Sequence, residues 1–267
     1  MREPARLAIL GMGAMGQSCL EGLRERLPQT QFAFLEREHR IHRLSEETSA
    51  QGFSDVTELL DWQPDLVVEC AGHSAVRDAV PEALRRGVDV VVASLGVLGD
   101  NQVKMTLDEA AESSGARLTV VSGAIGGLDA LRAGMLAGVD SVVYEGRKPP
   151  SAWRGSAAEE LCALAQLEHA EVFFEGSARA AAAQFPKNAN VTAAVALAGV
   201  GFDSTVVRLI ADPHAKENSH TVDVEGAFGR LRIVLTNHPL PQNPKTSWLA
   251  ALSVQEAVLR RVEAIGF

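Results

Sequence analysis

The first part of the chain alternates short apolar, β-branched runs with longer segments of helical periodicity. The runs that predict strands are Leu7–Leu10, Phe32–Leu35, Leu66–Glu69, Val88–Ala93 and Arg117–Val121. Strands separated by helix-length segments indicate βαβ units, in which helices join parallel strands and cover the sheet. This part of the chain is therefore predicted to form a doubly wound parallel sheet.

Proline and glycine mark the ends of the helices between these strands. Pro81 lies near the start of a helix that continues to Arg86, and Gly87 follows its end. Gly115 follows the helix that contains Glu109–Ser113. Proline fits the first turn of a helix, where its missing amide hydrogen is not needed, and glycine often ends one. Such crossovers are the connections that parallel strands require.

The pattern changes after Gly123, where strands follow one another more closely. The predicted strands of this part are Glu171–Ala178, Ser204–Ala211, Thr221–Glu225 and Leu231–Thr236. Only Gly226–Arg230 separates the last two, which predicts an antiparallel hairpin. Pro186 is predicted to open a helix rich in alanine and valine that ends near residue 200. Residues 145–157, with Pro149, Pro150 and Gly155, are predicted to form a loop between two domains.

Pro244 is predicted to open the last helix, which continues to about Ile265. This helix carries apolar residues at a spacing that suits packing against the first domain. They are Leu249, Leu252, Val258 and Val262.

Composition and charge narrow the class of protein. The chain has 267 residues, of which 46% are hydrophobic, so it can bury a large core. A net charge of −9 disfavours nucleic acid and anionic membranes as partners. The chain contains no apolar run that would span a bilayer, and a strand is predicted a few residues after Met1, so we expect a cytoplasmic protein. The three cysteines have no paired spacing, which predicts structural roles and no metal site.

A glycine-rich segment directly follows the first predicted strand and leads into a helix. Its spacing is GxGxxG, in which Gly11 permits a tight turn, Gly13 lets a pyrophosphate approach the backbone, and Gly16 lets helix and strand pack closely. The helix N-terminus offers amide groups to the diphosphate. We therefore expect NAD or NADP as the cofactor. The predicted contacts in this segment are Gly11, Gly13, Ala14, Met15 and Gly16.

The fold class is thus predicted as α/β, with a Rossmann-type doubly wound parallel sheet and a second α/β catalytic domain whose sheet is mostly antiparallel. We expect a dinucleotide-binding domain over residues 1–121, completed by the C-terminal helix 246–267. Residues 122–245 are expected to form the catalytic domain.

Residues at later strand ends are predicted to complete the cofactor site. Glu36, at the end of the second strand, can accept both adenosine ribose hydroxyls, which favours NAD. Arg37 and Arg40 can instead bind the 2′-phosphate of NADP, so the preference stays open. Ala71 and Ser94 lie in small-residue turns after two other strands, where a cofactor can approach the backbone.

His220 is the candidate catalytic residue among seven histidines. It ends the polar segment that starts at Asp212 and directly precedes a predicted strand, a position from which a side chain can point into a cleft. Because a histidine with its ordinary pKa near 6.5 can accept or donate a proton at neutral pH, His220 suits general acid and base chemistry. A buried, merely structural histidine is the alternative.

Several short segments share their residues and their order with one enzyme family. They are Gly11–Gly16, Ser122–Gly127, Pro186–Val191, Ala211–Pro213, Asn218–His220 and Asn243–Ser247. Together they resemble the L-aspartate dehydrogenase family. The resemblance implies that His220 is catalytic, that Ala124 and Asn190 bind the cofactor, and that a dinucleotide domain is paired with an α/β catalytic domain.

The resemblance implies an NAD(P)-dependent oxidation of L-aspartate to iminoaspartate, and hence to oxaloacetate and ammonia, or the reverse reaction. This reaction would serve either pyridine nucleotide biosynthesis or aspartate catabolism. The substrate carboxylates need cationic or amide partners, and we expect these near predicted helix starts. The candidates are Lys187, Asn188, Lys245 and Thr246.

Two other interpretations stay open. One is another dehydrogenase of aspartate-derived metabolites, such as a homoserine dehydrogenase or a dihydrodipicolinate reductase-like enzyme. The other is an NAD(P)-binding sensor without catalysis. The Asn-x-His segment disfavours both enzymes, and the presence of His220 together with Asn218, Lys187 and Asn190 argues against the sensor. A homodimer is expected, because symmetric dimers are common among enzymes of this kind.

Overall fold

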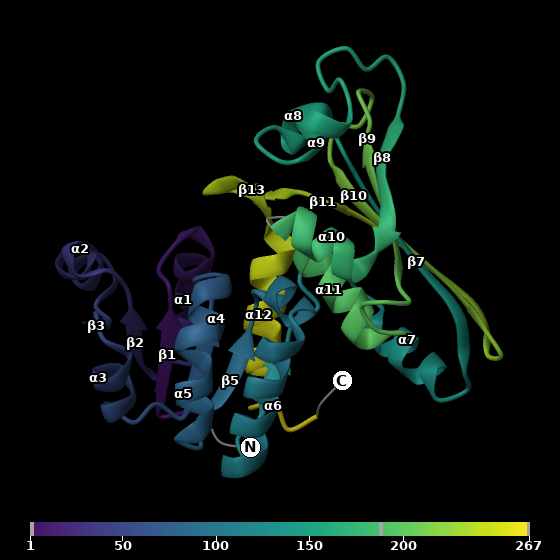
Figure 1. Cartoon of the computed structure of the whole chain (residues 1–267). Coiled ribbons are helices and arrows are strands. Elements are labelled where there is room, and N and C mark those ends of the chain that lie inside the picture. Colours follow the sequence, from purple (N-terminus) through teal and green to yellow (C-terminus); the bar gives the residue numbers. More distant parts are fainter. Residues whose placement is uncertain (1–2, 187–188, 266–267) are drawn as a thin grey trace. The chain divides into compact units, whose positions relative to one another are not determined.

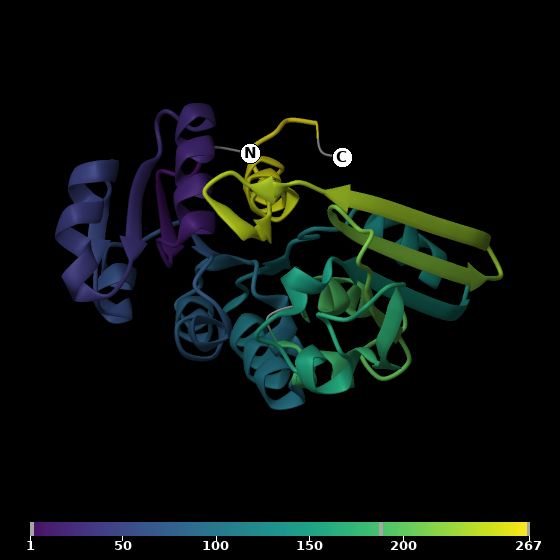
Figure 2. The same ribbon diagram turned by 90° about the horizontal axis from the view of Figure 1, so that it is seen from above.

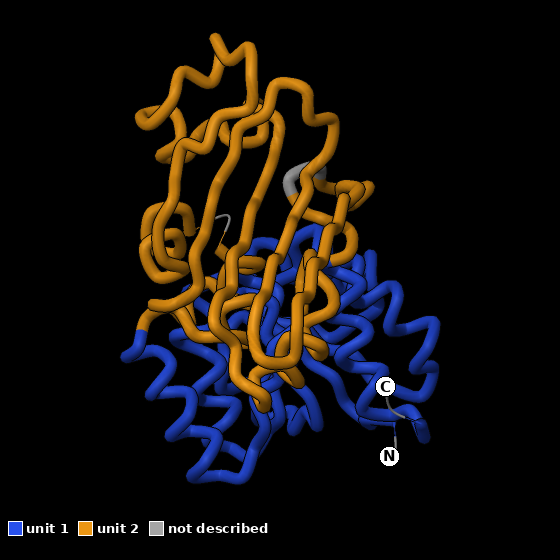
Figure 3. Tube along the Cα trace, turned by 90° about the vertical axis from the view of Figure 1, so that its right-hand side faces the viewer, with its two compact units in different colours: residues 1–94, 101–121, 250–267 blue, residues 95–100, 122–249 orange. Residues whose placement is uncertain are grey.

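The computed structural model describes residues 3–186 and 189–265, without the side chains of Pro244 and Lys245. The chain divides into two compact units (Figure 3). Unit 1 contains the residues up to Ser94, then Asn101–Val121 and the residues from Ala250 onward. Unit 2 contains Leu95–Asp100 and Ser122–Leu249.

Unit 1 is built on a parallel sheet that has six strands within the described residues. The strands are β1 (Arg6–Leu10), β2 (Gln31–Leu35), β3 (Gln51–Phe53), β4 (Leu66–Glu69), β5 (Asp89–Val92) and β6 (Leu118–Val120). Their order is β3-β2-β1-β4-β5-β6, and Ala8 in β1 pairs with Ala33 on one side and Val67 on the other. The strand order reverses between β1 and β4, where dinucleotides bind in such sheets. The predicted Rossmann-type fold is confirmed.

Helices surround this sheet (Figure 1). They are α1 (Ala14–Arg26), α2 (Glu38–Thr48), α3 (Val56–Asp61), α4 (His73–Asp78), α5 (Val80–Arg85), α6 (Asn101–Ser114) and α12 (Trp248–Leu259). The strands between them are apolar and buried, as parallel strands covered on both faces must be.

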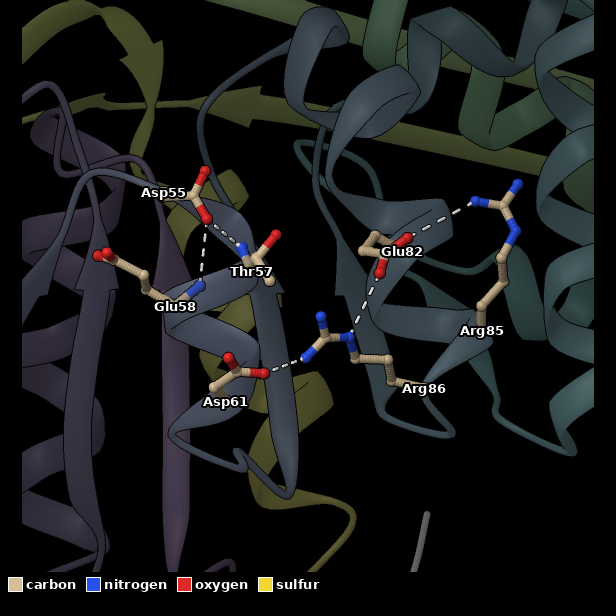
Figure 4. Close-up of polar contacts among 7 residues, drawn as sticks. All are labelled: Asp55, Thr57, Glu58, Asp61, Glu82, Arg85 and Arg86. Atoms are coloured by element: carbon tan, nitrogen blue, oxygen red, sulfur yellow. Dashed lines mark hydrogen bonds and ion pairs between the residues drawn. The ribbon is translucent and has the colours of Figure 1, made fainter.

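Polar contacts fix two short helices of unit 1, one contact at the start of α3 and the others at the ends of α3 and α5 (Figure 4). Asp55 caps α3 by accepting hydrogen bonds from the backbone amides of Thr57 at 2.7 Å and Glu58 at 3.2 Å, which lowers the pKa of its carboxyl. Arg86 joins α3 to α5, because its guanidinium donates to Asp61 at 2.6 Å and to Glu82 at 3.3 Å. Asp55 thus holds the start of α3 after the carboxyl end of β3, and Arg86 joins the end of α3 to the end of α5.

Helix α12 lies beside α1 (Figure 2). The side chain of Gln255 donates to the carbonyl of Ser18 at 3.1 Å, and a Cβ at Gly22 would lie 2.1 Å from the Gln255 amide oxygen. The thiol of Cys19 lies 3.6 Å from the carbonyl of Ala251. The last helix thus packs closely on the helix that follows the glycine loop. Among the residues described, no helix is both long and apolar enough to cross a membrane.

Unit 2 contains a five-stranded mixed sheet in its described part. The strands are β7 (Val139–Lys148), β8 (Glu171–Ser177), β9 (Val206–Ala211), β10 (Asn218–Gly226) and β11 (Gly229–Asn237). Their order is β11-β10-β7-β9-β8, in which only the β7–β9 pair is parallel. The mostly antiparallel second sheet and the β10–β11 hairpin are as predicted.

Helices of unit 2 lie on one side of this sheet (Figure 1). The remaining elements are η1 (Leu95–Gly99), α7 (Leu128–Met135), α8 (Pro150–Trp153), α9 (Ala158–Leu161), α10 (Ala178–Gln184), α11 (Ala189–Ala198), β12 (Pro239–Leu240) and β13 (Asn243–Ser247). A Cβ at Gly199, just after α11, would lie 3.3 Å from Val142 of β7 and from Leu131 of α7. The even-numbered residues of β7 therefore face the helices and the core.

Two sequence predictions in unit 2 are wrong. Residues 145–148 were expected in a loop because Pro149 and Pro150 follow them, yet they complete β7, the central strand of the sheet. Pro244 was expected to open a helix, but it lies in β13, and α12 begins at Trp248. A two-stranded sheet has only edge strands, and an edge strand tolerates a residue without an amide hydrogen.

Candidate active site

The glycine loop of unit 1 fits closely between neighbouring backbone segments. Gly11 has a φ of +88°, and a Cβ there would lie 2.6 Å from the Cα of Ala71. A Cβ at Gly16 would lie 2.0 Å from the carbonyl oxygen of Gly11. At Gly13, in contrast, a Cβ would meet no described atom within 4 Å. The first and third glycines thus permit close packing, and the second leaves the open side on which a pyrophosphate can approach.

Glu36 connects the end of β2 to the glycine loop. One carboxylate oxygen accepts from the amide of Met12 at 3.2 Å and from the guanidinium of Arg40 at 2.6 Å. Arg40 also donates to the carbonyl of Met12 at 3.1 Å. Both predicted ribose-binding groups, the Glu36 carboxylate and the Arg40 guanidinium, therefore lie beside the loop, whereas the side chain of Arg37 is exposed.

Glu69 is a buried carboxylate that sequence reasoning did not single out. It ends β4 and accepts from the amides of Ala71 and Gly72 at 2.8 and 2.7 Å. It also accepts from the amide and the hydroxyl of Ser94, both at 2.9 Å. Burial raises the pKa of Glu69, and the hydrogen bonds act in the opposite direction. This one side chain holds together the two turns in which cofactor contacts were predicted at Ala71 and Ser94.

His220 lies in unit 2, on β10, and its side chain is buried. Its Nδ1 forms a hydrogen bond of 2.8 Å with the hydroxyl of Tyr144, which lies on the neighbouring strand β7. The two rings are nearly parallel, with an interplanar angle of 15°. Burial lowers the pKa of His220 to about 3, and the charge of Lys148 adds to this effect. His220 is therefore a neutral imidazole at neutral pH. It lies within a strand rather than at the end of a loop, because β10 begins at Asn218.

Gly146 provides the space for this hydrogen bond. It pairs directly with His220 in the β10–β7 register. A Cβ at Gly146 would lie only 2.8 Å from the hydroxyl oxygen of Tyr144. The tyrosine ring therefore passes over the glycine on its way to His220, and the absence of a side chain at this position makes that path possible.

Lys148 lies on the same face of β7 as Tyr144, because side chains alternate along a strand. Its Nζ is 4.7 Å from the ring centroid of Trp153. The Trp153 ring is fully buried, and its Nε1 donates to the carbonyl of Ile210 at 3.0 Å. Burial lowers the pKa of Lys148 to about 8.

The residues predicted to contact the cofactor from unit 2 are tied to this sheet and to η1. The carbonyl of Ala124 accepts from the side chain of Asn237 at 2.8 Å. Asn237 pairs with Asn218, two residues before His220. The Asn190 side-chain oxygen accepts from the amide of Gly96 at 3.0 Å. The amide nitrogen of Asn190 is then the group with which it would donate to a ligand.

The predicted substrate-binding residues are only partly described. Lys187 and Asn188 lie outside the described residues, and so does the side chain of Lys245. Thr246 was expected near a helix start, but it lies in β13, where its hydroxyl accepts from Asn243 at 3.0 Å. In the described ranges, no three His, Cys, Asp or Glu side chains form a group that could hold a metal ion.

Three polar residues near the glycine loop and His220 were not predicted from the sequence. Glu69 is an acidic residue at the end of an otherwise apolar strand, and Tyr144 is the single tyrosine of the chain. Lys148 was assigned to a loop. The alternation through Val142, Tyr144 and Gly146 is a signal that could have revealed β7.

Comparisons with known proteins identify the family. Residues 129–261 match the family model "Aspartate dehydrogenase, C-terminal", and residues 11–121 match "Homoserine dehydrogenase, NAD binding domain". L-aspartate dehydrogenase of Cupriavidus necator is 43% identical over 262 residues, which cover 97% of this chain and 98% of the relative. L-aspartate dehydrogenase of Pseudomonas aeruginosa is 49% identical over 203 residues, 76% of either chain.

A solved structure shares the fold. Aspartate dehydrogenase of Thermotoga maritima matches with a TM-score of 0.76 at 24% identity, and the match covers 98% of this chain and 99% of that one. The chain contains an NAD(P)-binding domain and is an oxidoreductase. With the sequence identities given above, the chain belongs to the L-aspartate dehydrogenase family.

Proposed function

We propose that the chain catalyses the reversible NAD(P)-dependent oxidation of L-aspartate to iminoaspartate, which water converts to oxaloacetate and ammonia. The observation that carries this proposal is the buried, neutral imidazole of His220, held by Tyr144 of the neighbouring strand. The reaction requires one proton to leave the substrate amine and another to leave the attacking water. A neutral imidazole is a group that can accept such a proton.

The hydrogen bond to Tyr144 occupies Nδ1 of His220, so Nε2 is the ring nitrogen that can accept a proton from the substrate or from water. For Nε2 of His220 to accept a proton, Nδ1 must carry the hydrogen and donate it to the Tyr144 oxygen. A protonated His220 would be disfavoured by burial and by Lys148. The two carboxylates of a bound aspartate favour the protonated form, because negative charge nearby raises the pKa of an imidazole. Substrate binding would therefore make His220 a stronger base.

The residues of the glycine loop fit a nicotinamide dinucleotide. Gly11, Gly13 and Gly16 would let the diphosphate approach the start of α1, and Glu36 would accept the ribose hydroxyls. Glu69 would keep the turns at Ala71 and Ser94 in place beneath the cofactor. A bound nicotinamide would supply the hydride acceptor for the substrate Cα. Ala124 and Asn190 remain the candidate contacts from unit 2.

We further propose the organisation expected from the sequence, with a dinucleotide-binding domain over 1–121, completed by the C-terminal helix, and a catalytic domain over 122–245. The packing of Gln255 on α1 supports the assignment of that helix to the first domain. We also propose a homodimer in the cytoplasm. The free thiols of Cys19, Cys70 and Cys162 support a reducing compartment. Light scattering of the purified protein measures the oligomeric state.

The test is reduction of NAD and of NADP, measured at 340 nm, with L-aspartate, D-aspartate, L-glutamate and L-homoserine supplied separately. We expect a signal with L-aspartate. Turnover of L-homoserine instead would indicate a homoserine dehydrogenase. His220→Gln should abolish turnover and keep dinucleotide binding, because the glycine loop is unchanged. A protein that binds dinucleotide and turns over none of the four amino acids would contradict the proposal and favour a reductase or a sensor.

A further inference from the structure

We propose that Lys148 is the cationic group that binds a carboxylate of the substrate beside His220. This inference rests on the proposed function and assigns a substrate-binding role to a residue that sequence reasoning placed in a loop. Its basis is the position of Lys148 on β7, the fixed aromatic ring beneath its ammonium group, and its electrostatic coupling to His220.

The strand register places Lys148 next to the catalytic candidate. His220 pairs with Gly146, and Lys148 follows Gly146 by two residues on β7. Two residues along a strand span about 6–7 Å and return the side chain to the same face. Tyr144 occupies the corresponding position on the other side of Gly146. The hydroxyl of Tyr144 and the ammonium of Lys148 thus lie on the sheet face that carries the imidazole.

Trp153 restrains the Lys148 side chain. The ammonium lies 4.7 Å from the centroid of the tryptophan ring, a distance at which a cation and an aromatic ring attract each other. The ring itself is held by its hydrogen bond to Ile210 and by edge-on packing against Phe173 at a centroid distance of 4.8 Å. Pro149 and Pro150 turn the chain directly after Lys148 and so return Trp153 to it. A restrained side chain loses little freedom when it binds a ligand.

Among the described residues, the arginines of β7 and β9 lie on the sheet face away from His220 and form ion pairs with carboxylates there. Arg147 lies on the opposite face of β7, and its guanidinium donates to Asp212 at 2.7 Å. Arg208 of β9 donates to Glu175 at 2.8 Å and also contacts Glu145. These ion pairs belong to the face of the sheet that carries the odd-numbered residues of β7.

Electrostatics favour an anionic ligand between Lys148 and His220. Burial lowers the pKa of both groups, so each resists becoming charged, and the charge of Lys148 further disfavours a protonated His220. A carboxylate placed between them stabilises the ammonium and the imidazolium at the same time. Aspartate, unlike neutral amino acids, carries a second carboxylate, so this contact would also contribute to specificity for an acidic substrate.

The test compares Lys148→Met and Lys148→Arg with wild type and with Lys104→Met as the matched control. Lys104 lies on α6 and pairs with the exposed Asp108, so its loss should leave the KM unchanged. We expect Lys148→Met to raise the KM for L-aspartate roughly 10- to 100-fold, the loss typical of a charged hydrogen bond. Lys148→Arg should recover part of that loss, because it keeps the positive charge. Binding of NAD(P), measured without substrate, should stay unchanged.

A second measurement does not depend on turnover. Succinate carries two carboxylates and no amine, so its binding to the NAD(P)-loaded enzyme, followed by calorimetry, measures carboxylate recognition directly. We expect Lys148→Met to weaken succinate binding by a factor similar to the increase in KM. Lys148→Gln provides a second neutral variant if Lys148→Met fails to fold.

Two results would overturn the inference. The first is an unchanged KM together with succinate binding that is equal in wild type and variants or absent from both. The second is a loss of kcat in both Lys148→Met and Lys148→Arg with unchanged KM and succinate binding, which would make Lys148 a proton acceptor instead. A wild-type enzyme without aspartate oxidation would contradict the proposed function, and the succinate measurement would still report on Lys148.

Discussion

The hydroxyl of Tyr144 and Nδ1 of His220 lie 2.8 Å apart, on neighbouring antiparallel strands of one sheet. Because Tyr144 is completely buried, which raises its pKa, its hydroxyl stays neutral and can hold one nitrogen of the imidazole. The orientation of His220 is thus set by a residue that lies 76 positions away in the sequence.

Replacing Tyr144 by Phe should lower kcat for L-aspartate about 5- to 10-fold, because a typical hydrogen bond contributes about 1 kcal/mol. The ring remains, so the fold should be kept, and NAD(P) binding should not change. Steady-state kinetics and equilibrium binding measure the two quantities. Thr221→Val, next to His220 on the opposite face of β10, is the control and should keep its kcat. Equal kcat values for Tyr144→Phe and wild type would contradict a positioning role for Tyr144.

Gly146→Ala should displace the tyrosine hydroxyl from His220, because the new methyl group would lie 2.8 Å from it. We expect a loss of stability of about 1–3 kcal/mol, as for other overpacked sites, together with a lower kcat. In the Tyr144→Phe background the hydroxyl is absent, so the same substitution should cost less. Denaturant unfolding of the four proteins measures this coupling. Additive effects of the two substitutions would show that the methyl group does not act through the hydroxyl.

Glu69→Gln should weaken NAD(P) binding and destabilise the protein by about 2–3 kcal/mol, because an amide group cannot accept all the hydrogen bonds of the carboxylate. The NH2 group of the glutamine side chain would also face the backbone amides of the two turns, and two donors cannot form a hydrogen bond with each other. Equilibrium dinucleotide binding and denaturant unfolding test this. The exposed Glu109→Gln on α6 is the control. Wild-type affinity in Glu69→Gln would show that the turns hold their shape without this carboxylate.

Glu36→Ser should shift the cofactor preference towards NADP by about tenfold or more. The carboxylate that accepts ribose hydroxyls is lost, and Arg40, now released from its ion pair with Glu36, can bind a 2′-phosphate. The ratio of the dissociation constants for NADP and NAD is the quantity to measure. Glu38→Gln, at the exposed start of α2, should leave the ratio unchanged. An unaltered ratio in Glu36→Ser would mean that Glu36 does not contact the ribose.

The lowered pKa of His220 predicts a stability that depends on pH. Between pH 6.5, the ordinary value, and about 3, the unfolded chain binds a proton that the folded protein lacks. Stability should therefore fall as the pH falls through this range and rise with increasing pH. Denaturant unfolding at pH 4.5 and 7.0 should show a smaller difference for His220→Gln than for wild type. The exposed His42→Gln is the control, and an identical pH dependence in His220→Gln and wild type would contradict the assignment.

The dinucleotide-binding half could be predicted largely from local sequence. The strand before Gly11, the spacing of the three glycines and the acidic residue at Glu36 are all requirements of short segments, so they can be read without knowing the fold. Apolar runs located β1, β2, β4, β5 and β6 because buried parallel strands are apolar along their whole length. Ala124 and Asn190 came from the resemblance to a family, whereas His220 was indicated both by its position after a polar segment and by that resemblance.

Strand pairing decided the rest of the site. The register of β7 against β10 places three residues beside His220, although the two strands are far apart in the chain. These residues are Tyr144, Gly146 and Lys148. Pro149 and Pro150 suggested a loop because proline acts locally, whereas the partner strands of β7 stabilise it from a distance. Glu69 likewise matters because two separate turns direct their amides at it. A turn or a glycine motif depends on adjacent residues, so the sequence alone can reveal it. Contacts between strands depend on how the whole sheet packs, and only the tertiary structure decides them.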